Sequence, residues 1–483
     1  MISDFQDHKK FGAYDLCVVG SGPAGITLAL QLARQGLRIA LLEGGGLSYD
    51  EASQSLYAVK TLGVDLYAQG ARLRYFGGTS NHWSGRCRPF EAADFSGDPL
   101  GGMPGWPIAF EEFNRFLPEA MHILDLPETG FSAVNPDMPG GKFSADRFAM
   151  SSPTRYASKY LEEIKASKNI DLFYNCNCVD VIYNKATGDI SSISLVDYKK
   201  QRSSVTALRY VLALGAIENA RMLLHSETLQ AAKLQGMHWA GRCFMEHLNI
   251  SLGSFIASEQ FKYSDAQYFP SDRFVGLSKT GRGNISFGVV QEVNSYGRTA
   301  STKNFFKNLA CNLGVSDKVQ FIENFNCPGA GTIGTLLEQF PSAEGSRITL
   351  SEERDALGVR KAVVKWVLSP EDKMTIRTIG REIAKNFASS GLGFVKLNDF
   401  VTNDSLEIQF SHHCHHMGTT RMASSSRWGV VDKNCKVFGV SNLYIAGSSV
   451  FSTGGGGNPT MPLVQLAVRL ADHLLKNPGT NSH

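Results

Sequence analysis

The chain has 483 residues, of which 43% are hydrophobic and 19% are charged, and 48 basic against 45 acidic side chains leave a formal net charge of +3. This composition excludes extensive disorder, and the length exceeds one ordinary hydrophobic core, so two domains are expected. The basic residues form no cluster longer than the pairs Lys9-Lys10 and Lys199-Lys200. Nucleic acid is therefore not an expected partner.

The sequence carries no pattern of export or membrane insertion. Residues 1–10 lack the basic-then-apolar order of a secretory signal, and no window approaches 18 consecutive apolar residues. We therefore expect a cytoplasmic protein without a membrane span. The nine cysteines are an odd number with no repeated CxxC spacing, which predicts reduced packing residues rather than a disulfide framework or an iron–sulfur cluster.

A dinucleotide-binding signature lies near the N-terminus. Residues 14–19 are predicted to form a buried strand, which leads into the turn Gly20-Ser-Gly-Pro-Ala-Gly25. An apolar helix is expected from about residue 26 to residue 34. Strand, glycine-rich turn and helix in this order are typical of a βαβ nucleotide-binding unit.

The three glycines of this turn have different expected roles. Gly20 permits a tight turn, Gly22 lets a pyrophosphate approach the backbone, and Gly25 allows the helix to pack closely on the strand. A second predicted strand, residues 38–43, ends in Glu43, which lies 23 residues after Gly20. That spacing suits an acidic side chain that binds ribose hydroxyl groups.

The middle of the chain alternates between irregular and regular patterns. Residues 50–165 are irregular and contain the glycine-rich stretch 77–85, which is expected to be a cap and a loop facing the cofactor. Alternating stretches follow at residues 171–183 and 190–198, and residues 207–224 form another strand–glycine–helix unit. The nucleotide-binding domain is therefore expected to resume there.

The C-terminal half is predicted to begin with strands and to end in a helix. Strand-like runs precede one helical stretch at residues 371–389, which favours an α+β unit over about residues 235–410. Those runs lie at residues 249–256, 284–290, 347–351 and 362–368. A turn at residues 454–457 and a helix at residues 463–475 follow.

Polar residues suited to acid–base chemistry lie in this last segment. Four histidines precede a Gly-Thr pair, namely His412, His413, His415 and His416. Flavin-dependent alcohol oxidation needs a base for the hydroxyl proton and a second polar group for the oxygen, and a histidine of near-neutral pKa with the Asn458 amide would fit. Ordinary loop histidines, or metal ligands together with Cys414, are the open alternatives, although adjacent strand residues point to opposite faces.

Together these motifs resemble the glucose–methanol–choline (GMC) family of flavoprotein oxidoreductases. The resemblance covers nearly the whole chain and rests on five ordered motifs: residues 18–25, 77–80, 212–219 and 241–247, and His415-x-x-Gly-Thr with residues 430–432 and 442–444. It implies that His415 is the catalytic base and Asn458 its partner. That asparagine resembles the partner in pyranose 2-oxidase and bacterial sugar dehydrogenases, which favours a carbohydrate substrate.

The resemblance implies an α/β fold of the GMC and p-hydroxybenzoate hydroxylase kind. A Rossmann-like FAD-binding domain would be assembled from discontinuous segments, with an α+β substrate-binding domain beside it. The expected divisions are the first FAD-binding part (1–95), a cap and flavin-covering segment (96–168), the second FAD-binding part (169–234), the substrate-binding domain (235–408), the third FAD-binding part with the catalytic residues (409–476) and a tail (477–483).

The cofactor implied is FAD, and no metal is expected. Its predicted contacts are Gly20, Ser21, Gly22, Pro23, Ala24, Gly25, Glu43, Gly44, Gly77, Gly78, Thr79, Asn81, His82, Trp83, Ser84, Val179, Ala213, Gly215, Asn219, Gly447, Ser448, Asn458, Pro459 and Thr460.

Two of these residues carry particular expectations. His82 resembles a histidine that is joined covalently to the flavin 8α-methyl group in pyranose 2-oxidase, and the alternative is stacking or hydrogen bonding beside the ring. Ser84 would approach flavin N5, or it is a simple turn serine. The last helix, expected to begin near Pro462, would direct its positive end toward flavin N1 and O2.

The predicted protein is thus a monomeric or weakly oligomeric FAD enzyme that oxidises a secondary alcohol, on a sugar or glycoside, to a ketone. Oxidation of a non-sugar alcohol, a lyase with a non-redox flavin, and an ordinary NAD enzyme are the alternatives. Oxygen, a quinone and a protein are equal candidates for the electron acceptor. Residues 270–330 match no known pattern and are expected to set substrate choice, while Gln339 and Phe340 face either the substrate or the surface.

Overall fold

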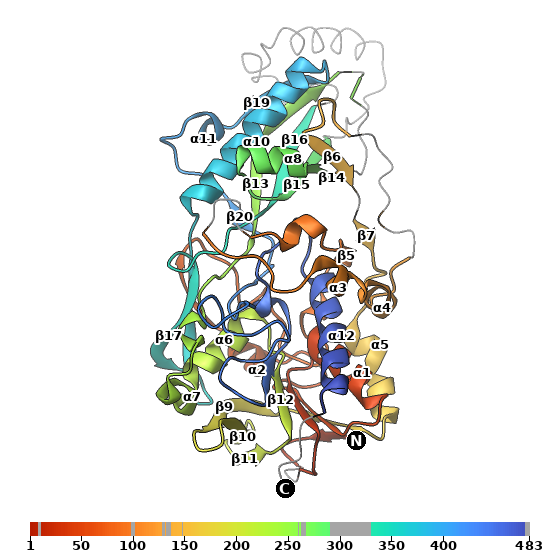
Figure 1. The fold of residues 1–483 in the computed structure, drawn as a ribbon, viewed down its shortest axis with the longest axis vertical. Coiled ribbons are helices and arrows are strands. Elements are labelled where there is room, and N and C mark those ends of the chain that lie inside the picture. The colour runs from red at the N-terminus through yellow and green to blue at the C-terminus, as the bar shows by residue number, and fades with distance from the viewer. Residues whose placement is uncertain are drawn as a thin grey trace.

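The computed structural model describes residues 1–7, 11–97, 102–127, 131, 137–146, 148–258, 260–261, 267–289 and 330–478. Two sheets dominate this part of the chain. A parallel sheet lies in the lower half of the view in Figure 1, and a larger antiparallel sheet lies in the upper half. Residues 290–329, most of the stretch expected to set substrate choice, lie outside the described residues, as do residues 479–483 of the tail.

A six-stranded parallel sheet forms the lower half, in the order β1-β8-β3-β2-β12-β21. Its strands are β1 (Ile2–Asp4), β2 (Leu16–Val19), β3 (Ile39–Leu42), β8 (Ile170–Tyr174), β12 (Arg209–Leu212) and β21 (Leu443–Ile445). They come from three distant parts of the chain. The predicted fold class, a Rossmann-like domain assembled from discontinuous segments, is therefore confirmed.

Helices cover the parallel sheet, which explains why its central strands are apolar without alternation. Every residue of β2, β3 and β12 is buried, as expected for parallel strands that are covered on both faces. In Figure 1 one group of helices lies to the right of the sheet, comprising α1 (Pro23–Ala33), α3 (Phe110–Asn114), α4 (Leu117–Ile123), α5 (Tyr156–Ala166) and α12 (Thr460–Lys476). On the left lie α6 (Ala216–His225) and α7 (Glu227–Ala232).

Smaller elements complete this half. The alternating stretches of the middle segment form an antiparallel sheet of β9 (Asn177–Asn184), β10 (Asp189–Val196) and β11 (Arg202–Val205). The irregular segment before it contains α2 (Glu51–Ser55), β4 (Lys60–Gly63), and a two-stranded sheet of β5 (Arg86–Cys87) and β7 (Ala149–Met150).

The upper half is a seven-stranded sheet in the order β19-β13-β16-β15-β14-β6, with β20 also paired to β13. Its strands are β6 (Phe143–Asp146), β13 (His247–Ala257), β14 (Gln267–Pro270), β15 (Gly283–Val289), β16 (Ala330–Glu338), β19 (Gly393–Leu397) and β20 (Ser411–His412). The hairpin of β17 (Arg347–Arg354) and β18 (Arg360–Trp366) lies lower in Figure 1, against α6, and forms a separate three-stranded sheet with β4. Two short helices accompany the seven-stranded sheet, α8 (Asp272–Ser278) and α11 (Asp399–Thr402).

The long helix α10 (Pro370–Ser389) packs against this sheet and agrees with the helix expected at residues 371–389. Its start is fixed locally, because Ser369 and Asp372 form a reciprocal capping box and Pro370 occupies the first turn. Buried apolar residues such as Ile376 and Ile383 recur at helical spacing on its inner face.

Strand pairing joins segments that the expected domain divisions separate. The strand β4 pairs with β18, β6 pairs with β14, and β20 pairs with β13. The divisions themselves stay a prediction. These pairings nevertheless show that segments before and after residues 235–408 pair with strands of that range at three places.

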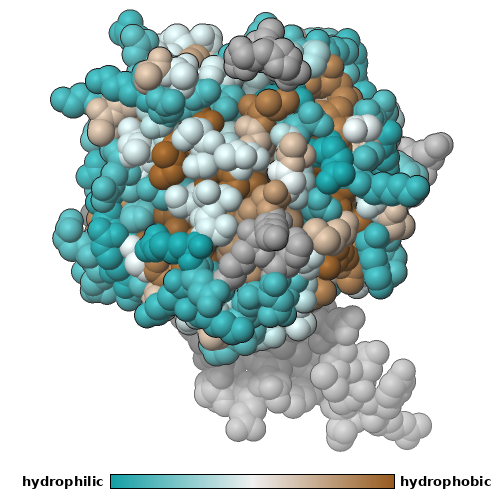
Figure 2. All heavy atoms as spheres, turned by 90° about the horizontal axis from the view of Figure 1, so that it is seen from below, coloured by the Kyte–Doolittle hydropathy of each residue, from teal (hydrophilic) through white to brown (hydrophobic). Residues whose placement is uncertain are grey.

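Two further features concern the surface and the cysteines. Within the described ranges, no helix combines the length and the apolar character needed to cross a membrane. Figure 2 shows a face with hydrophilic side chains around its rim and apolar ones among them nearer its centre. Seven cysteines fall in the described part of the chain, and all seven are free thiols.

Candidate functional site

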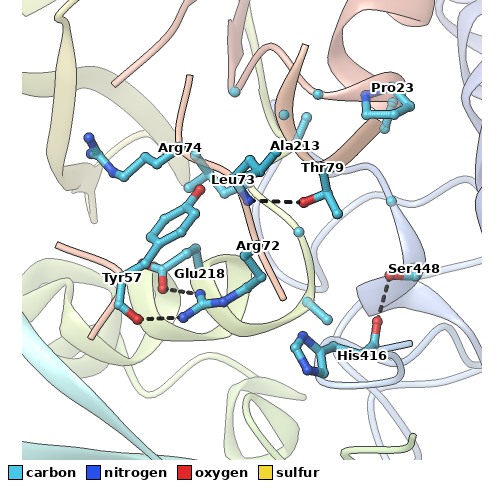
Figure 3. Close-up of a pocket in the computed structure, with 18 of the residues that line it drawn as sticks. Pro23, Tyr57, Arg72, Leu73, Arg74, Thr79, Ala213, Glu218, His416 and Ser448 are labelled. Carbon is cyan, nitrogen blue, oxygen red and sulfur yellow. Dashed lines mark hydrogen bonds and ion pairs between the residues drawn. The ribbon is translucent and has the colours of Figure 1, made fainter. Parts of the chain in front are cut away.

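A cavity of about 490 Å³ lies along the carboxyl edge of the parallel sheet (Figure 3). Four of the loops that line it follow β2, β3, β12 and β21. Because the carboxyl ends of parallel strands meet at one edge of a sheet, loops that are far apart in sequence converge there. The same cavity also receives the segment 413–416 and the segment 458–460.

The first turn of α1 is suited to a diphosphate. Gly22 is the N-cap residue, Pro23 follows it, no side chain caps the helix, and no acidic residue lies in the first turn. The free N–H groups and the positive end of the helix therefore face the cavity. A Cβ added at Gly22, Gly215 or Gly447 would meet no protein atom within 4 Å, so these backbones leave room for a ligand.

Two other glycines of the turn serve the packing of the protein itself. Gly20 has φ +108°, and a Cβ there would lie 2.6 Å from the Ala213 carbonyl oxygen. A Cβ on Gly25 would collide with the Gly20 carbonyl oxygen. The different roles expected for Gly20, Gly22 and Gly25 therefore agree with the space around each of them.

Charged side chains of both signs line the same cavity. Glu43 is buried; its carboxylate accepts the Ser21 hydroxyl at 2.5 Å and the Gly45 N–H at 2.7 Å. Arg74 donates to the neutral groups Asn177 Oδ1 at 2.8 Å and Tyr198 OH at 2.9 Å. Within the described part of the chain, no carboxylate lies within 4 Å of its guanidinium. The acid can accept ribose hydroxyls, and the cation adds positive charge for a diphosphate.

Most of the predicted cofactor residues line this cavity. They are Gly20, Ser21, Gly22, Pro23, Ala24, Glu43, Gly44, Gly78, Thr79, His82, Trp83, Ser84, Ala213, Gly215, Gly447, Ser448, Asn458, Pro459 and Thr460. The backbone cradle and the acid fit a dinucleotide such as FAD: the first turn of α1 would hold its diphosphate, and Glu43 would accept from a ribose, with the Arg74 guanidinium close by beside Gly44.

Five predicted cofactor residues do not line the cavity, namely Gly25, Gly77, Asn81, Val179 and Asn219. The two amides hold neighbouring loops instead. Asn81 Nδ2 donates to the Phe76 carbonyl at 2.9 Å, while Asn219 donates to Ser449 Oγ at 2.9 Å and accepts the Leu214 N–H at 2.9 Å.

The structure brings His415 and Asn458 to the same cavity. Burial holds the pKa of His415 well below its ordinary value, rather than near neutrality. The ring is therefore neutral at physiological pH and has a lone pair that can accept a proton. Its backbone N–H is anchored, because it donates to both oxygens of the buried Glu246 carboxylate at 2.7 and 2.8 Å.

The helix α12 begins at the cavity. It starts at Thr460, two residues before the expected Pro462, because proline is tolerated in a first turn, where the N–H groups have no partner within the helix. Pro459 is its N-cap residue, and its first turn contains no acidic residue. The positive end of α12 therefore adjoins Asn458. It could stabilise negative charge on a flavin at that position, as expected from the sequence.

Comparison with known proteins agrees with this geometry. Residues 15–246 match the model described as FAD dependent oxidoreductase, and residues 341–467 match the model described as GMC oxidoreductase. The two matched segments contain the diphosphate cradle and the His415–Asn458 segment, respectively. The chain is a GMC-family FAD oxidoreductase.

Relatives of this GMC enzyme extend over its whole length. It is 23% identical to the 2-methyl-1,2-propanediol dehydrogenase of Mycolicibacterium austroafricanum, over 95% of each chain. It is 21% identical to the fructose dehydrogenase large subunit of Gluconobacter japonicus, over 96% of this chain and 98% of the relative. The crystal structure of pyridoxine 4-oxidase from Mesorbium loti has the same fold, with a TM-score of 0.59, 15% identity, and coverage of 96% of this chain and 99% of that one. The two relatives are named dehydrogenases, and the structural neighbour is named an oxidase.

The histidines around His415 differ in position. His413, Cys414 and His416 line the cavity of the GMC enzyme, whereas His412 does not. His416 is buried, its Nε2 has no hydrogen-bond partner among the described residues, and burial lowers its pKa to about 3. Among the described residues, no group of three or more histidine, cysteine or acidic side chains is arranged to hold a metal ion.

Several residues that line or support the site were not predicted. Arg72 donates to Glu218 at 2.7 Å and to the Tyr57 carbonyl at 2.6 Å (Figure 3), and Arg221 joins Glu218 to Asp355. Glu218 lies in the motif 212–219, which was the available signal for it. The partners of His415, Glu246 and His247, lie in the motif 241–247.

The two residues expected to face either the substrate or the surface do neither. Gln339 is 2% exposed and Phe340 is 7% exposed, and neither lines the cavity. Gln339 accepts the Trp366 indole N–H at 2.9 Å and donates to the Val367 carbonyl at 2.8 Å. It is a buried structural amide, because every polar atom that folding removes from water needs a partner.

Proposed function

We propose that the enzyme oxidises a secondary alcohol of a sugar or glycoside to a ketone. His415 removes the hydroxyl proton, and Asn458 donates a hydrogen bond to the same oxygen as it gains negative charge. Bound FAD would supply the acceptor for the hydride at N5. The observation that carries this proposal is that His415 and Asn458 line one cavity with the dinucleotide cradle.

The choice of a sugar has two supports. The partner of the base is an amide, Asn458, as in the sugar-oxidising members that the sequence resembles. One of the relatives that matches over nearly its whole length is named a fructose dehydrogenase. Another is named a propanediol dehydrogenase, so small diols belong in the same test.

The test is anaerobic titration of the FAD-loaded enzyme with D-glucose, D-fructose, methyl α-D-glucopyranoside, 1,2-propanediol and 2-propanol. We expect one of the sugars to bleach the visible absorbance of the oxidised flavin fastest. A lyase on the same scaffold would convert substrate without bleaching, and fastest bleaching by 2-propanol would contradict the sugar assignment.

The role of His415 is tested by His415→Ala, with His412→Ala as the matched control. We expect His415→Ala to slow flavin reduction by about 10²–10⁴-fold while FAD stays bound, because general-base catalysis contributes about that much. His412 is close in sequence but does not line the cavity, so its replacement should leave the rate nearly unchanged. Reduction by His415→Ala at the wild-type rate would disprove the role.

A further inference from the structure

The histidine His247 contacts the proposed base directly, although its motif has no assigned role. It is the first residue of β13 and is fully buried. Its Nδ1 lies 2.8 Å from Nδ1 of His415, and its Nε2 lies 2.8 Å from the Gly455 carbonyl oxygen. The two imidazole rings meet edge to face at 89°, with their centroids 5.1 Å apart.

These two contacts determine where the protons lie. A carbonyl oxygen can only accept, so Nε2 of His247 must carry a hydrogen that it donates to Gly455. Burial lowers the pKa of His247 to about 3, which keeps the ring neutral. A neutral imidazole has one N–H, so Nδ1 of His247 has a lone pair and can only accept.

The contact between the two rings then requires that His415 donates its Nδ1–H. In the opposite tautomer of His415, two lone pairs would face each other across 2.8 Å. Such a contact would be repulsive and would leave two buried acceptors without a donor. The neutral His415 ring therefore keeps its lone pair on Nε2.

We infer that His247 is a positioning residue, which fixes the tautomer and the orientation of His415 so that Nε2 is the atom that removes the substrate proton. This role rests on the proposed function. When Nε2 takes up the hydroxyl proton, His415 becomes a cation that still donates Nδ1–H to His247. That bond becomes charge-assisted, and no proton passes to His247.

A neutral acceptor has a different effect from a carboxylate in this position. A carboxylate would stabilise the imidazolium strongly and raise the pKa of the base. His247 carries no charge, and the other ionisable groups that act on His415 are His413, His416 and Arg86, which lower its pKa. From His415, Glu246 accepts the backbone N–H and no ring hydrogen. The arrangement therefore orients the base while raising its basicity much less than a carboxylate would.

Two amide variants separate the contacts of His247. In His247→Asn the side-chain oxygen takes about the position of Nδ1 and can still accept from His415. In His247→Gln the amide nitrogen takes about the position of Nε2 and can still donate to Gly455, but the acceptor for His415 is lost. We expect His247→Gln to slow flavin reduction by about 10–100-fold, the range known for removing the partner that orients a metal-bound histidine, and His247→Asn to stay within a few-fold of wild type.

The pH profile of flavin reduction distinguishes positioning from a general loss of structure. Loss of the Nδ1 acceptor destabilises the protonated form of His415, so the acidic limb in His247→Gln should move to lower pH while the plateau falls. A purely structural defect would lower the plateau without moving the limb. The substrate for these measurements is the sugar of the panel that bleaches the wild-type flavin fastest.

A second measurement needs no substrate. In the FAD-loaded wild-type enzyme with ¹⁵N-labelled histidines, NMR should show His415 protonated at Nδ1, with His415→Gln used to assign its signals. Protonation at Nε2 would overturn the inference, as would a slow His247→Asn beside a normal His247→Gln. Failure of the proposed function is distinct, because it would appear as undiminished reduction in His415→Ala.

Discussion

The two halves of the molecule contribute to the site in different ways. The parallel sheet contributes backbone: the loops after β2, β12 and β21 place the open glycines Gly22, Gly215 and Gly447 around one cavity. The antiparallel sheet contributes side chains through strand register, because His247 of β13 lies opposite Glu338 of β16. Backbone cradles are encoded by local sequence, whereas side-chain pairs depend on strands that are distant in the chain.

The join between the halves is the loop 454–457. Its Gly454 and Gly455 N–H groups donate to Oε1 of Glu338, and the Gly455 carbonyl accepts from His247. This loop leads directly into Asn458 and α12. The proposed catalytic segment is thus held from the antiparallel side, and it lines the cavity at the edge of the parallel sheet.

The largest effect is expected from a pair of glycine variants in the cradle. Gly25→Ala places a methyl group against the Gly20 carbonyl, so we expect a loss of stability of about 1–3 kcal/mol or more and no retained FAD. Gly22→Ala places its methyl group in open space, so the apoprotein should keep its stability and bind FAD more weakly. Thermal unfolding of the apoproteins and FAD titration measure the two quantities. Equal destabilisation by both variants would contradict the distinction between packing and ligand contact.

The difference between packing and ligand contact also shows what the sequence could predict. Residues 20–24, Glu43 and residues 413–416 each follow a strand whose end determines their position, and the structure brings them to one cavity. Their roles in binding and catalysis stay predictions. The family resemblance added the pairing of His415 with Asn458. The order of the upper sheet could not be derived, since antiparallel pairing partners depend on the whole set of strands rather than on local pattern.

Sequence patterns failed to predict other parts of the site for two physical reasons. A motif amide that contacts a ligand and one that supports a loop look alike in sequence, and Asn219 proved to be the second kind. Contacts between distant residues leave no local trace: the bond from His247 to Gly455 spans 208 positions. Gln339 shows the same limit, because its buried partner Trp366 lies on another strand.

Variants of Glu338 test how much strand register contributes to holding the loop 454–457. Glu338→Ala removes the acceptor of two buried N–H groups, which should cost about 1–3 kcal/mol of unfolding free energy and slow flavin reduction through the displaced loop. Both bonds end on the same oxygen, so Glu338→Gln can retain them and should lose less than about 1 kcal/mol. Chemical unfolding of the two variants gives the comparison. A Gln variant as unstable as the Ala variant would show that charge, not the acceptor, is required.

The free energy of unfolding at acidic pH tests the protonation state of two buried histidines at the site, His247 and His416. The folded pKa values of His416 and His247 are both about 3 because burial penalises their charged forms, whereas unfolded histidines titrate near 6.5. Below pH 6.5 these two histidines bind more protons in the unfolded chain than in the folded one. Their contribution to stability is therefore fully present above pH 6.5 and falls as the pH drops. Each histidine contributes about 1.4 kcal/mol per pH unit.

The variant His416→Leu tests this pH dependence. Its slope of unfolding free energy between pH 5.5 and pH 4, where the unfolded histidine is protonated and the folded one is not, should be smaller by nearly one proton, about 1.3 kcal/mol per pH unit. Nε2 of the ring lies 3.7 Å from Oε2 of Glu246 but makes no hydrogen bond among the described residues, so no hydrogen bond of that atom is lost in the replacement. Denaturant titrations at several pH values provide the measurement. An unchanged slope would mean that His416 is protonated in the folded protein.

The smallest expected change concerns His82 on the parallel side of the cavity. Its ring is exposed, lines the cavity and makes no hydrogen bond among the described residues, so it is free to stack beside a flavin. We expect FAD to be held without a covalent bond, and acid precipitation should release the yellow colour from wild type and His82→Ala alike. Colour that stays in the wild-type pellet but leaves the variant would indicate a bond to His82. In that case a side chain, and not the glycine backbone alone, would fix the cofactor on the parallel side, and the contrast between the two halves would be weaker.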